Sequence, residues 1–327
     1  MDVNYMQYAL RLGRRNLGQT DANPSVGCVI VHGDAVVGIG TTSIGGRPHA
    51  EVNAINMAGS FAHGADMYVT LEPCSHTGKT PPCTDAIITA GIKRVFIGAI
   101  DTNPKVNGQG IAMLKAAGIE VVSGILEQQA RQKMAGFFSC IEHSRPYVTL
   151  KIATDVNNDI AKGNGQPVWV TSKLARAYAH KLRSQHDCLL TSAKTVVEDN
   201  PKLNVRLPGL EGKSPDIAII GGEDYNTTSE YHDILMYKYF YKKQCFMEVL
   251  ADLKLKNYTN ILVEAGLSLA TSFIKQGLVD KLIWIKSKHV SNASNKVKFV
   301  PDLYRFKLCN TMQLPEDIIY TYSNAYR

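Results

Sequence analysis

The chain has 327 residues, 45% of them hydrophobic and 20% charged, a composition typical of globular proteins, and its length favours two domains of about 150 residues. No stretch approaches the roughly 18 consecutive apolar residues of a membrane span, and the N-terminus lacks the basic start and apolar run of a signal peptide. The odd number of cysteines, seven, argues against a disulfide framework and predicts a reducing, cytoplasmic location.

The first elements lead to a group of metal-binding residue types. We expect an amphipathic helix over residues 4–17, strands over 26–31 and 35–39 joined by a hairpin, and a helix from His49 to about residue 57. A short apolar strand over 67–71 then delivers Glu72-Pro73-Cys74, and Cys83 opens a helix over 84–90. A helix N-terminus favours the thiolate form of a cysteine, which is the form that binds zinc.

His49, Cys74 and Cys83 supply one imidazole and two thiolates, which fill three corners of a zinc tetrahedron and leave the fourth for water. Glu51 is too close to His49 in the chain to be a further ligand, but it is well placed to carry a proton. This combination is typical of zinc-dependent base deaminases, in which the activated water attacks an amidine carbon and ammonia leaves. A closed structural zinc site, with His76 as the fourth ligand, is the alternative.

The remainder of the first half alternates strands and helices. We expect a strand over 94–100, a helix over 110–117, a strand over 119–122 and one helix over 126–142, and hence a sheet covered by helices on both faces. The loop over 99–108 follows a strand end, where α/β sheets bind ligands. Residues 143–146 break the last helix, so we predict domains over 1–143 and 147–327.

The second half begins a new α/β pattern. Strands are expected over 147–154, 187–191, 216–220, 260–264 and 278–285, and helices over 173–184, 192–197, 244–253 and 268–276. The tyrosine-rich segment 231–241 has no clear period. No G-x-G-x-x-G follows a first strand, so the ordinary dinucleotide-binding fingerprint is absent.

The basic excess falls in this second half. Residues 1–146 hold 12 Lys and Arg against 11 Asp and Glu, whereas residues 147–327 hold 24 against 18. A nucleic-acid deaminase would carry its basic excess beside the metal motif. The distribution therefore disfavours a polynucleotide and fits a phosphorylated small molecule and a phosphorylated dinucleotide.

The run TLEPCSHTGKTPPC over residues 70–83 resembles, almost letter for letter, the bifunctional deaminase–reductase family of riboflavin biosynthesis. The resemblance implies a cytidine-deaminase-like three-layer α/β/α domain followed by a dihydrofolate-reductase-like α/β domain. Members deaminate 2,5-diamino-6-(5-phosphoribosylamino)pyrimidin-4-one and then reduce the ribosyl group to ribityl with NADPH. It also implies substrate contacts in the first domain from Asn23, His76, Lys79 and Thr80.

In the second domain the strongest matching block is KTVVEDNPKLNVR over residues 194–206. The resemblance places Lys151, Asp199 and Glu264 around the sugar carbon that receives hydride. Its implied cofactor contacts are Ala153, Trp169, Thr195, Asp199 and Gly266, and its implied substrate contacts are Arg183, Leu203 and Arg206.

Several positions depart from the family pattern. Asn158 replaces a glycine, and Pro167 stands where a substrate-contacting serine is usual. The strand end Ile219-Ile220-Gly221-Gly222 lacks the common Asp-Ser, the stretch over 206–264 is short, and residues 287–300 lack the usual Pro-Lys-Leu-Leu-Gly turn.

Three hypotheses follow. The first is a bifunctional enzyme that uses zinc and NADPH on a small phosphoribosylated pyrimidine, as a homo-oligomer that acts on neither nucleic acid nor membrane. The second is a deaminase of a nucleoside, free base or tRNA. The third is a deaminase fused to a catalytically impaired reductase-like module, which the departures at Asn158 and Pro167 favour.

Overall fold

The computed structural model describes residues 2–104, 106–161, 169–221, 238–241, 245–293 and 295–326. The chain divides into two compact units, Met1–Ser144 and Arg145–Arg327. None of the described helices is long and apolar enough to cross a membrane.

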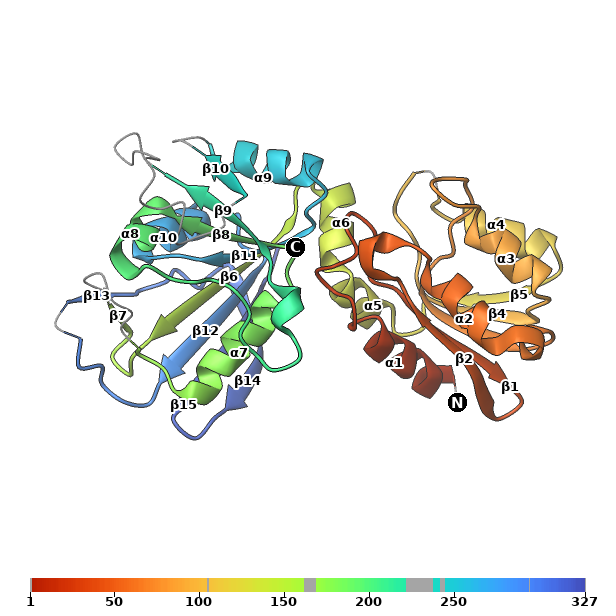
Figure 1. Ribbon diagram of the computed structural model, residues 1–327, viewed down its shortest axis with the longest axis horizontal. Helices are drawn as coiled ribbons and strands as arrows, with labels where there is room; N and C mark the ends of the chain where they lie inside the picture. Colours follow the sequence, from red (N-terminus) through yellow and green to blue (C-terminus); the bar gives the residue numbers. More distant parts are fainter. Residues whose placement is uncertain are drawn as a thin grey trace. The chain divides into compact units, whose positions relative to one another are not determined.

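The first unit is built on a five-stranded sheet of order β2-β1-β3-β4-β5 (Figure 1). Its strands are β1 (Gly27–His32), β2 (Ala35–Thr41), β3 (Asp66–Leu71), β4 (Arg94–Ala99) and β5 (Glu120–Ser123). β1 is antiparallel to both of its neighbours, whereas β3, β4 and β5 run parallel. The carboxyl ends of β3 and β4 therefore meet at one edge of the sheet.

Helices cover both faces of this sheet, which confirms the expected three-layer α/β/α arrangement. They are α1 (Asp2–Leu12), α2 (Ala50–Ala58), α3 (Cys83–Thr89), α4 (Gln109–Ala116), α5 (Glu127–Lys133) and α6 (Ala135–Glu142). α2 packs on β1 and β2 and contacts α3, which in turn contacts α4; α1 and α5 pack on β3 and β4 from the other face. The core between the layers is made of side chains such as Ile30, Val69 and Ile97.

The expected single helix over residues 126–142 is wrong. Met134 has φ −109° and ψ 25°, which is outside the helical range, and it separates α5 from α6. The sequence gives little local signal for this break, because methionine is a good helix former. The first helix is also shorter than the range 4–17, since α1 ends at Leu12.

The second unit is built on an eight-stranded sheet of order β10-β9-β8-β11-β6-β12-β15-β14. Its strands are β6 (Tyr147–Thr154), β8 (Cys188–Ser192), β9 (Asp216–Ile220), β10 (Tyr239–Tyr241), β11 (Asn260–Glu264), β12 (Lys281–Ser287), β14 (Phe306–Gln313) and β15 (Asp317–Asn324). The strands from β10 to β12 run parallel, and β15 and β14 extend the sheet as antiparallel strands. A separate ribbon pairs β7 (Asp159–Ala161) with β13 (Lys296–Lys298).

The sheet of the second unit is also covered on both faces (Figure 1). Its helices are α7 (Lys173–Arg183), α8 (Ala193–Asp199), α9 (Phe246–Leu255) and α10 (Leu267–Lys275). Side chains of α7 and α8 pack with Leu262 of β11, whereas those of α9 and α10 pack with its neighbours Ile261 and Val263. This alternation along β11 is expected of a strand buried on both faces. The α/β architecture is the one that the family resemblance implied.

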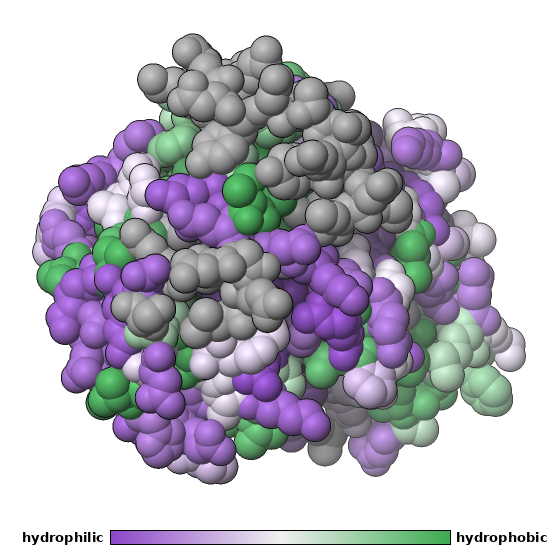
Figure 2. Space-filling view, turned by 60° about the vertical axis from the view of Figure 1, so that its left-hand side comes forward, coloured by the Kyte–Doolittle hydropathy of each residue, from purple (hydrophilic) through white to green (hydrophobic). Residues whose placement is uncertain are grey.

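The expected strands and helices of the second unit are confirmed with shifts of a few residues at their ends, but five strands were not predicted: β7, β10, β13, β14 and β15. β14 has mostly exposed side chains, so it lacks the apolar alternation that marks a half-buried strand. Of the segment 231–241, residues 239–241 form β10; Pro167 and residues 222–237 lie outside the described residues. On the face shown in Figure 2, hydrophilic residues predominate and hydrophobic ones form small separate groups.

A buried ion pair joins the start of the second unit to the sheet. Arg145 is 1% exposed, and its Nη1 and Nη2 donate to the two carboxylate oxygens of Asp280, each at 2.7 Å. Asp280 Oδ2 also accepts from the backbone N–H of Val148 at the beginning of β6, at 2.8 Å. The pair therefore fixes the chain entry, β6 and the segment before β12 together.

Replacing Asp280 by Ala should lower the free energy of unfolding by about 3–5 kcal/mol, because the Arg145 guanidinium would stay buried without its counter-charge. Urea unfolding followed by tryptophan fluorescence reports on this unit, since Trp169 and Trp284 both belong to it. Glu316→Ala, which removes an exposed carboxylate of the same unit, is the control. A loss for Asp280→Ala no larger than that of the control would contradict this role.

Candidate active sites

Three donor atoms converge at one edge of the first sheet. His49 is the N-cap of α2, Cys83 is the first residue of α3, and Cys74 follows β3 after two residues. His49 Nδ1 lies 3.2 Å from Cys83 Sγ and 3.6 Å from Cys74 Sγ, and the three donors all lie within 4.8 Å of one another. One nitrogen and two sulfur donors in this spacing fit zinc with one coordination position left open.

The surroundings of the two thiols favour a thiolate at Cys74. Hydrogen bonds from the Cys83 thiol, from His49 and from the Cys83 backbone N–H lower the pKa of Cys74 to about 4. The N–H of Cys83 can donate to Cys74 because it belongs to the first turn of α3, where backbone N–H groups have no partner within the helix. A helix N-terminus thus supports the negative charge that a soft metal ion requires.

Glu51 lies in the first turn of α2 and is only 4% exposed. Burial raises the pKa of its carboxyl, and the charge of Cys74 raises it further, against a lowering by His49. A buried carboxyl with a raised pKa takes up a proton more readily than an exposed one, which suits a group that accepts and returns a proton.

Close packing of α2 on β2 fixes this position. A Cβ on Gly40 of β2 would stand 2.0 Å from the carbonyl oxygen of Ala50, so only glycine permits the contact.

Glu72 positions the loop after β4, a role that the sequence reasoning did not assign. Its buried carboxylate accepts backbone N–H groups from Asp101 at 3.3 Å, Gly108 at 3.0 Å and Ile111 at 3.2 Å. These bonds connect the segment that carries Cys74 with the loop over 99–108. The available signal was an acidic residue between an apolar strand and the Pro-Cys pair, since a buried carboxylate needs donors.

The predicted substrate contacts of this unit lie on two segments. His76, Lys79 and Thr80 are exposed in the loop between Cys74 and Cys83, and their side chains have no hydrogen-bond partner among the described residues. Asn23 lies in a turn in which its carbonyl oxygen accepts a hydrogen bond from Thr20 Oγ1. Its side-chain amide packs closely against Gly46, since a Cβ added to Gly46 would stand 2.2 Å from Asn23 Nδ2. The structure therefore leaves the loop side chains available for a ligand.

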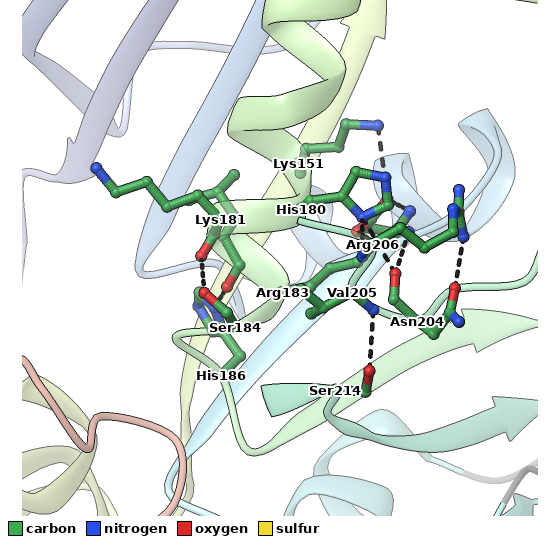
Figure 3. Close-up of polar contacts among 12 residues, drawn as sticks. Lys151, His180, Lys181, Arg183, Ser184, His186, Asn204, Val205, Arg206 and Ser214 are labelled. Atoms are coloured by element: carbon green, nitrogen blue, oxygen red, sulfur yellow. Dashed lines mark hydrogen bonds and ion pairs between the residues drawn. The ribbon is translucent and has the colours of Figure 1, made fainter. Parts of the chain in front are cut away.

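A second polar cluster lies in the other unit, where β6, β11, α7 and the segment over 204–206 meet (Figure 3). Glu264, the last residue of β11, is 7% exposed and pairs with Arg183 through bonds of 2.7 and 2.9 Å. Lys151 Nζ lies 3.6 Å from Glu264 Oε2, because Lys151 on β6 is directly opposite Glu264 in the sheet register. Two of the three residues predicted around the sugar carbon are thus in contact.

Charge determines the state of this cluster. Burial alone would raise the pKa of Glu264, but the charges of Arg183 and Lys151 and their hydrogen bonds lower it to about 2. The carboxylate therefore remains ionised at physiological pH. Its contacts hold the side chains of both cations in place.

Arg183 also donates from Nη1 to the Asn204 carbonyl at 3.1 Å, and Arg206 donates to the Asn204 side chain. His180 Nδ1 lies 3.2 Å from the Asn204 carbonyl oxygen and 3.3 Å from the backbone N of Arg206. Burial, and then the charges of Arg183 and Arg206, lower the pKa of His180. His180 was not predicted, although it lies three residues before Arg183 and hence on the same helix face.

Leu203 has φ +49° and a side chain that is 3% exposed and belongs to the hydrophobic core. Only its backbone is therefore free to reach a ligand. Such a strained non-glycine residue is more frequent at functional sites than elsewhere.

Two of the predicted cofactor contacts, Thr195 and Gly266, lie together just after the carboxyl ends of β8 and β11. Thr195 Oγ1 accepts the backbone N–H of Gly266 at 3.2 Å and lies 2.9 Å from Ser192 Oγ. Ala153 is half-buried on β6, on the same face as Lys151. Trp169 is 62% exposed with the guanidinium of Arg176 4.7 Å above its ring, and Asp199 is half-buried at the end of α8.

The departure at Asn158 does not break the turn between β6 and β7. Asn158 adopts φ +65°, a conformation that asparagine tolerates better than most residues. Asp155, buried within the same turn, accepts backbone N–H groups from Asn157 at 2.8 Å, Asp159 at 3.0 Å and Ser291 at 3.1 Å. The buried carboxylate of Asp155 thus holds the turn in place.

Two family models match the chain, one in each unit. Residues 1–99 match the family model of the cytidine and deoxycytidylate deaminase zinc-binding region, and residues 146–287 match that of the RibD C-terminal domain. The first match contains all three proposed zinc donors, and the second contains Lys151, Arg183 and Glu264.

Similar proteins resemble the chain over most of its length. It is 38% identical to the riboflavin biosynthesis protein RibD of Aquifex aeolicus over 86% of both chains. It is 41% identical to that of Bacillus amyloliquefaciens, over 86% of this chain and 83% of the other.

Among solved structures, RibD of Acinetobacter baumannii superposes with a TM-score of 0.85 at 33% identity, covering 99% of this chain and 98% of that one. A Thermotoga maritima protein described as a diaminohydroxyphosphoribosylaminopyrimidine deaminase/5-amino-6-(5-phosphoribosylamino)uracil reductase superposes with a TM-score of 0.82 at 29% identity, with the same coverage. The chain belongs to the family of the riboflavin biosynthesis protein RibD.

Proposed function

We propose that the chain catalyses two successive steps of riboflavin biosynthesis. The first unit hydrolyses an exocyclic amine of 2,5-diamino-6-(5-phosphoribosylamino)pyrimidin-4-one with zinc, and the second reduces the ribosyl group of the product to ribityl with NADPH. The convergence of His49, Cys74 and Cys83 beside the buried Glu51 is the observation that carries the deaminase assignment.

In the deaminase, His49, Cys74 and Cys83 hold the metal. Zinc, when bound, lowers the pKa of a water molecule toward neutrality. Glu51 accepts a proton from the attacking water and passes it to the departing amino group, so that ammonia leaves as oxygen takes its place on the pyrimidine. The raised pKa of Glu51 suits both transfers, because its carboxyl holds a proton more readily than an ordinary glutamate does.

In the same unit, Asn23, His76, Lys79 and Thr80 hold the substrate. Two of these side chains are exposed cations or potential cations on the loop between the cysteines, which suits a phosphate.

In the reductase, bound NADPH would supply the hydride that reduces the sugar carbon. The ring oxygen released by that addition must receive a proton, and the Lys151 ammonium beside Glu264 is the donor we assign. Asp199 completes the polar surroundings of the carbon, and Arg183, Arg206 and the backbone of Leu203 hold the phosphorylated sugar. Ala153, Trp169, Thr195, Asp199 and Gly266 contact the cofactor.

The second hypothesis, a nucleoside, free-base or tRNA deaminase, does not account for the second unit. The third, an impaired reductase module, is not favoured, because the match to the RibD C-terminal domain spans residues 146–287 and the turn at Asn158 is intact. None of the seven cysteines, all of which lie in the described ranges, forms a disulfide, which suits the reducing cytoplasm in which we place the enzyme. We retain the homo-oligomer as a prediction.

Replacing Glu51 by Gln should leave zinc bound and lower the rate of deamination by at least about a hundredfold, because the amide cannot carry the proton. Ammonia release gives the rate, and atomic absorption gives the zinc content. A Glu51→Gln enzyme with near-normal turnover would contradict the proton-transfer role.

Replacing Cys83 by Ser should reduce the zinc content of the purified protein, because a hydroxyl is a much poorer zinc ligand than a thiolate. The control is Cys245→Ser, which alters an exposed thiol of the other unit and should retain zinc. Full zinc occupancy in Cys83→Ser would refute its assignment as a ligand.

Replacing Lys151 by Met should lower NADPH oxidation with the already deaminated pyrimidine by on the order of a hundredfold or more, because it removes the proton donor. Absorbance of NADPH measures the rate, and Lys275→Met, a change of an exposed lysine, is the control. Lys151→Met should also leave deamination unchanged. Oxidation at the wild-type rate would remove Lys151 from the mechanism.

A further inference from the structure

Three buried polar groups near the zinc donors have no hydrogen-bond partner within the described part of the chain. They are Nε and Nη1 of Arg47, Oγ of Ser75 and Oγ1 of Thr102. Each belongs to a segment that builds the deaminase site: Arg47 precedes His49 by two residues, Ser75 follows Cys74, and Thr102 lies in the loop that Glu72 holds. Buried polar atoms without partners are rare, so a group of them beside a site indicates the place of a polar ligand.

Arg47 is the charged member of this set. Its Nη2 lies 3.6 Å from the point where a Cβ on Gly78 would stand, so its guanidinium adjoins the loop between the two cysteines. Gly78 directly precedes Lys79 and follows His76 by two residues. No carboxylate forms an ion pair with Arg47 in the ranges that the structure describes. No acidic side chain therefore neutralises the positive charge of Arg47, and the nearby loop side chains of His76 and Lys79 are also without an acidic partner among the described residues.

The chemistry of the guanidinium selects the ligand. Its planar fork of N–H donors matches two oxygens of a phosphate, and such charge-assisted pairs are among the stronger hydrogen bonds in proteins. The pyrimidine ring of the proposed substrate is neutral, whereas its phosphate is an anion that compensates a partly buried cation. Neutral groups such as Ser75 and Thr102 lack this preference.

We propose that Arg47 binds the phosphate of the deaminase substrate, opposite the loop that carries His76 and Lys79, and so makes the deaminase selective for the phosphorylated pyrimidine. The proposal rests on the deaminase function above and adds a recognition residue to it.

The test compares two substrates, the phosphoribosylamino pyrimidine and the same compound with its phosphate removed. Arg47→Gln should lower kcat/KM for the phosphorylated form by about 10- to 100-fold through a higher KM, as expected for the loss of a hydrogen-bonded charge pair. It should leave kcat/KM for the dephosphorylated form unchanged. Arg11→Gln, which removes an exposed charge from α1 of the same unit, should alter neither value.

Zinc content and thermal unfolding are measured for each variant. Arg47→Lys keeps the positive charge but loses the planar fork of N–H donors, so the preference for the phosphorylated substrate should fall less than in Arg47→Gln. If Arg47→Gln loses zinc, Arg47→Lys replaces it as the test variant. Equal losses for both substrates, or a preference for the phosphorylated form that survives both substitutions, would overturn the proposal. A wild-type protein that deaminates neither compound would instead contradict the deaminase function itself.

Discussion

The deaminase half depends on one geometric requirement, that an imidazole and two thiolates meet within 4.8 Å. The chain satisfies it with the ends of elements rather than with their middles: the N-cap of α2, the first residue of α3 and the segment after β3. Helix N-termini place free backbone N–H groups there, and these favour thiolate over thiol. The close contact of Gly40 with α2 and the three bonds to Glu72 hold these ends in register with the sheet.

The second unit solves a different electrostatic problem. Glu264 is buried at the end of a central strand, where an isolated carboxylate would be costly. Arg183 and Lys151 compensate it, and the two cations are fixed by the same bonds. A carboxylate with a strongly lowered pKa thus holds two cations beside one another at the end of β11. The parallel pairing of β6 with β11 builds the sheet, and the same register sets Lys151 opposite Glu264.

The zinc donors were predictable because metal chemistry constrains both residue type and spacing, and the parallel strands were predictable because buried strands are continuous apolar runs. Other features had no comparable signal. The break at Met134 depends on tertiary packing rather than on propensity, and β14 is an exposed strand whose side chains are mixed. Arg47 and Glu72 could not be assigned, since a single charged residue in a sequence does not reveal whether it will be buried or which groups it will meet.

A bifunctional enzyme performs both reactions on the same pyrimidine. This is tested most directly by supplying the purified zinc-loaded protein with the diaminopyrimidine substrate and a measured amount of NADPH, and by assaying ammonia and NADP⁺ in the same sample. Both products should reach equal amounts once the substrate is consumed. Ammonia formed with no oxidation of NADPH would contradict it, because the second unit would then not act on the product of the first.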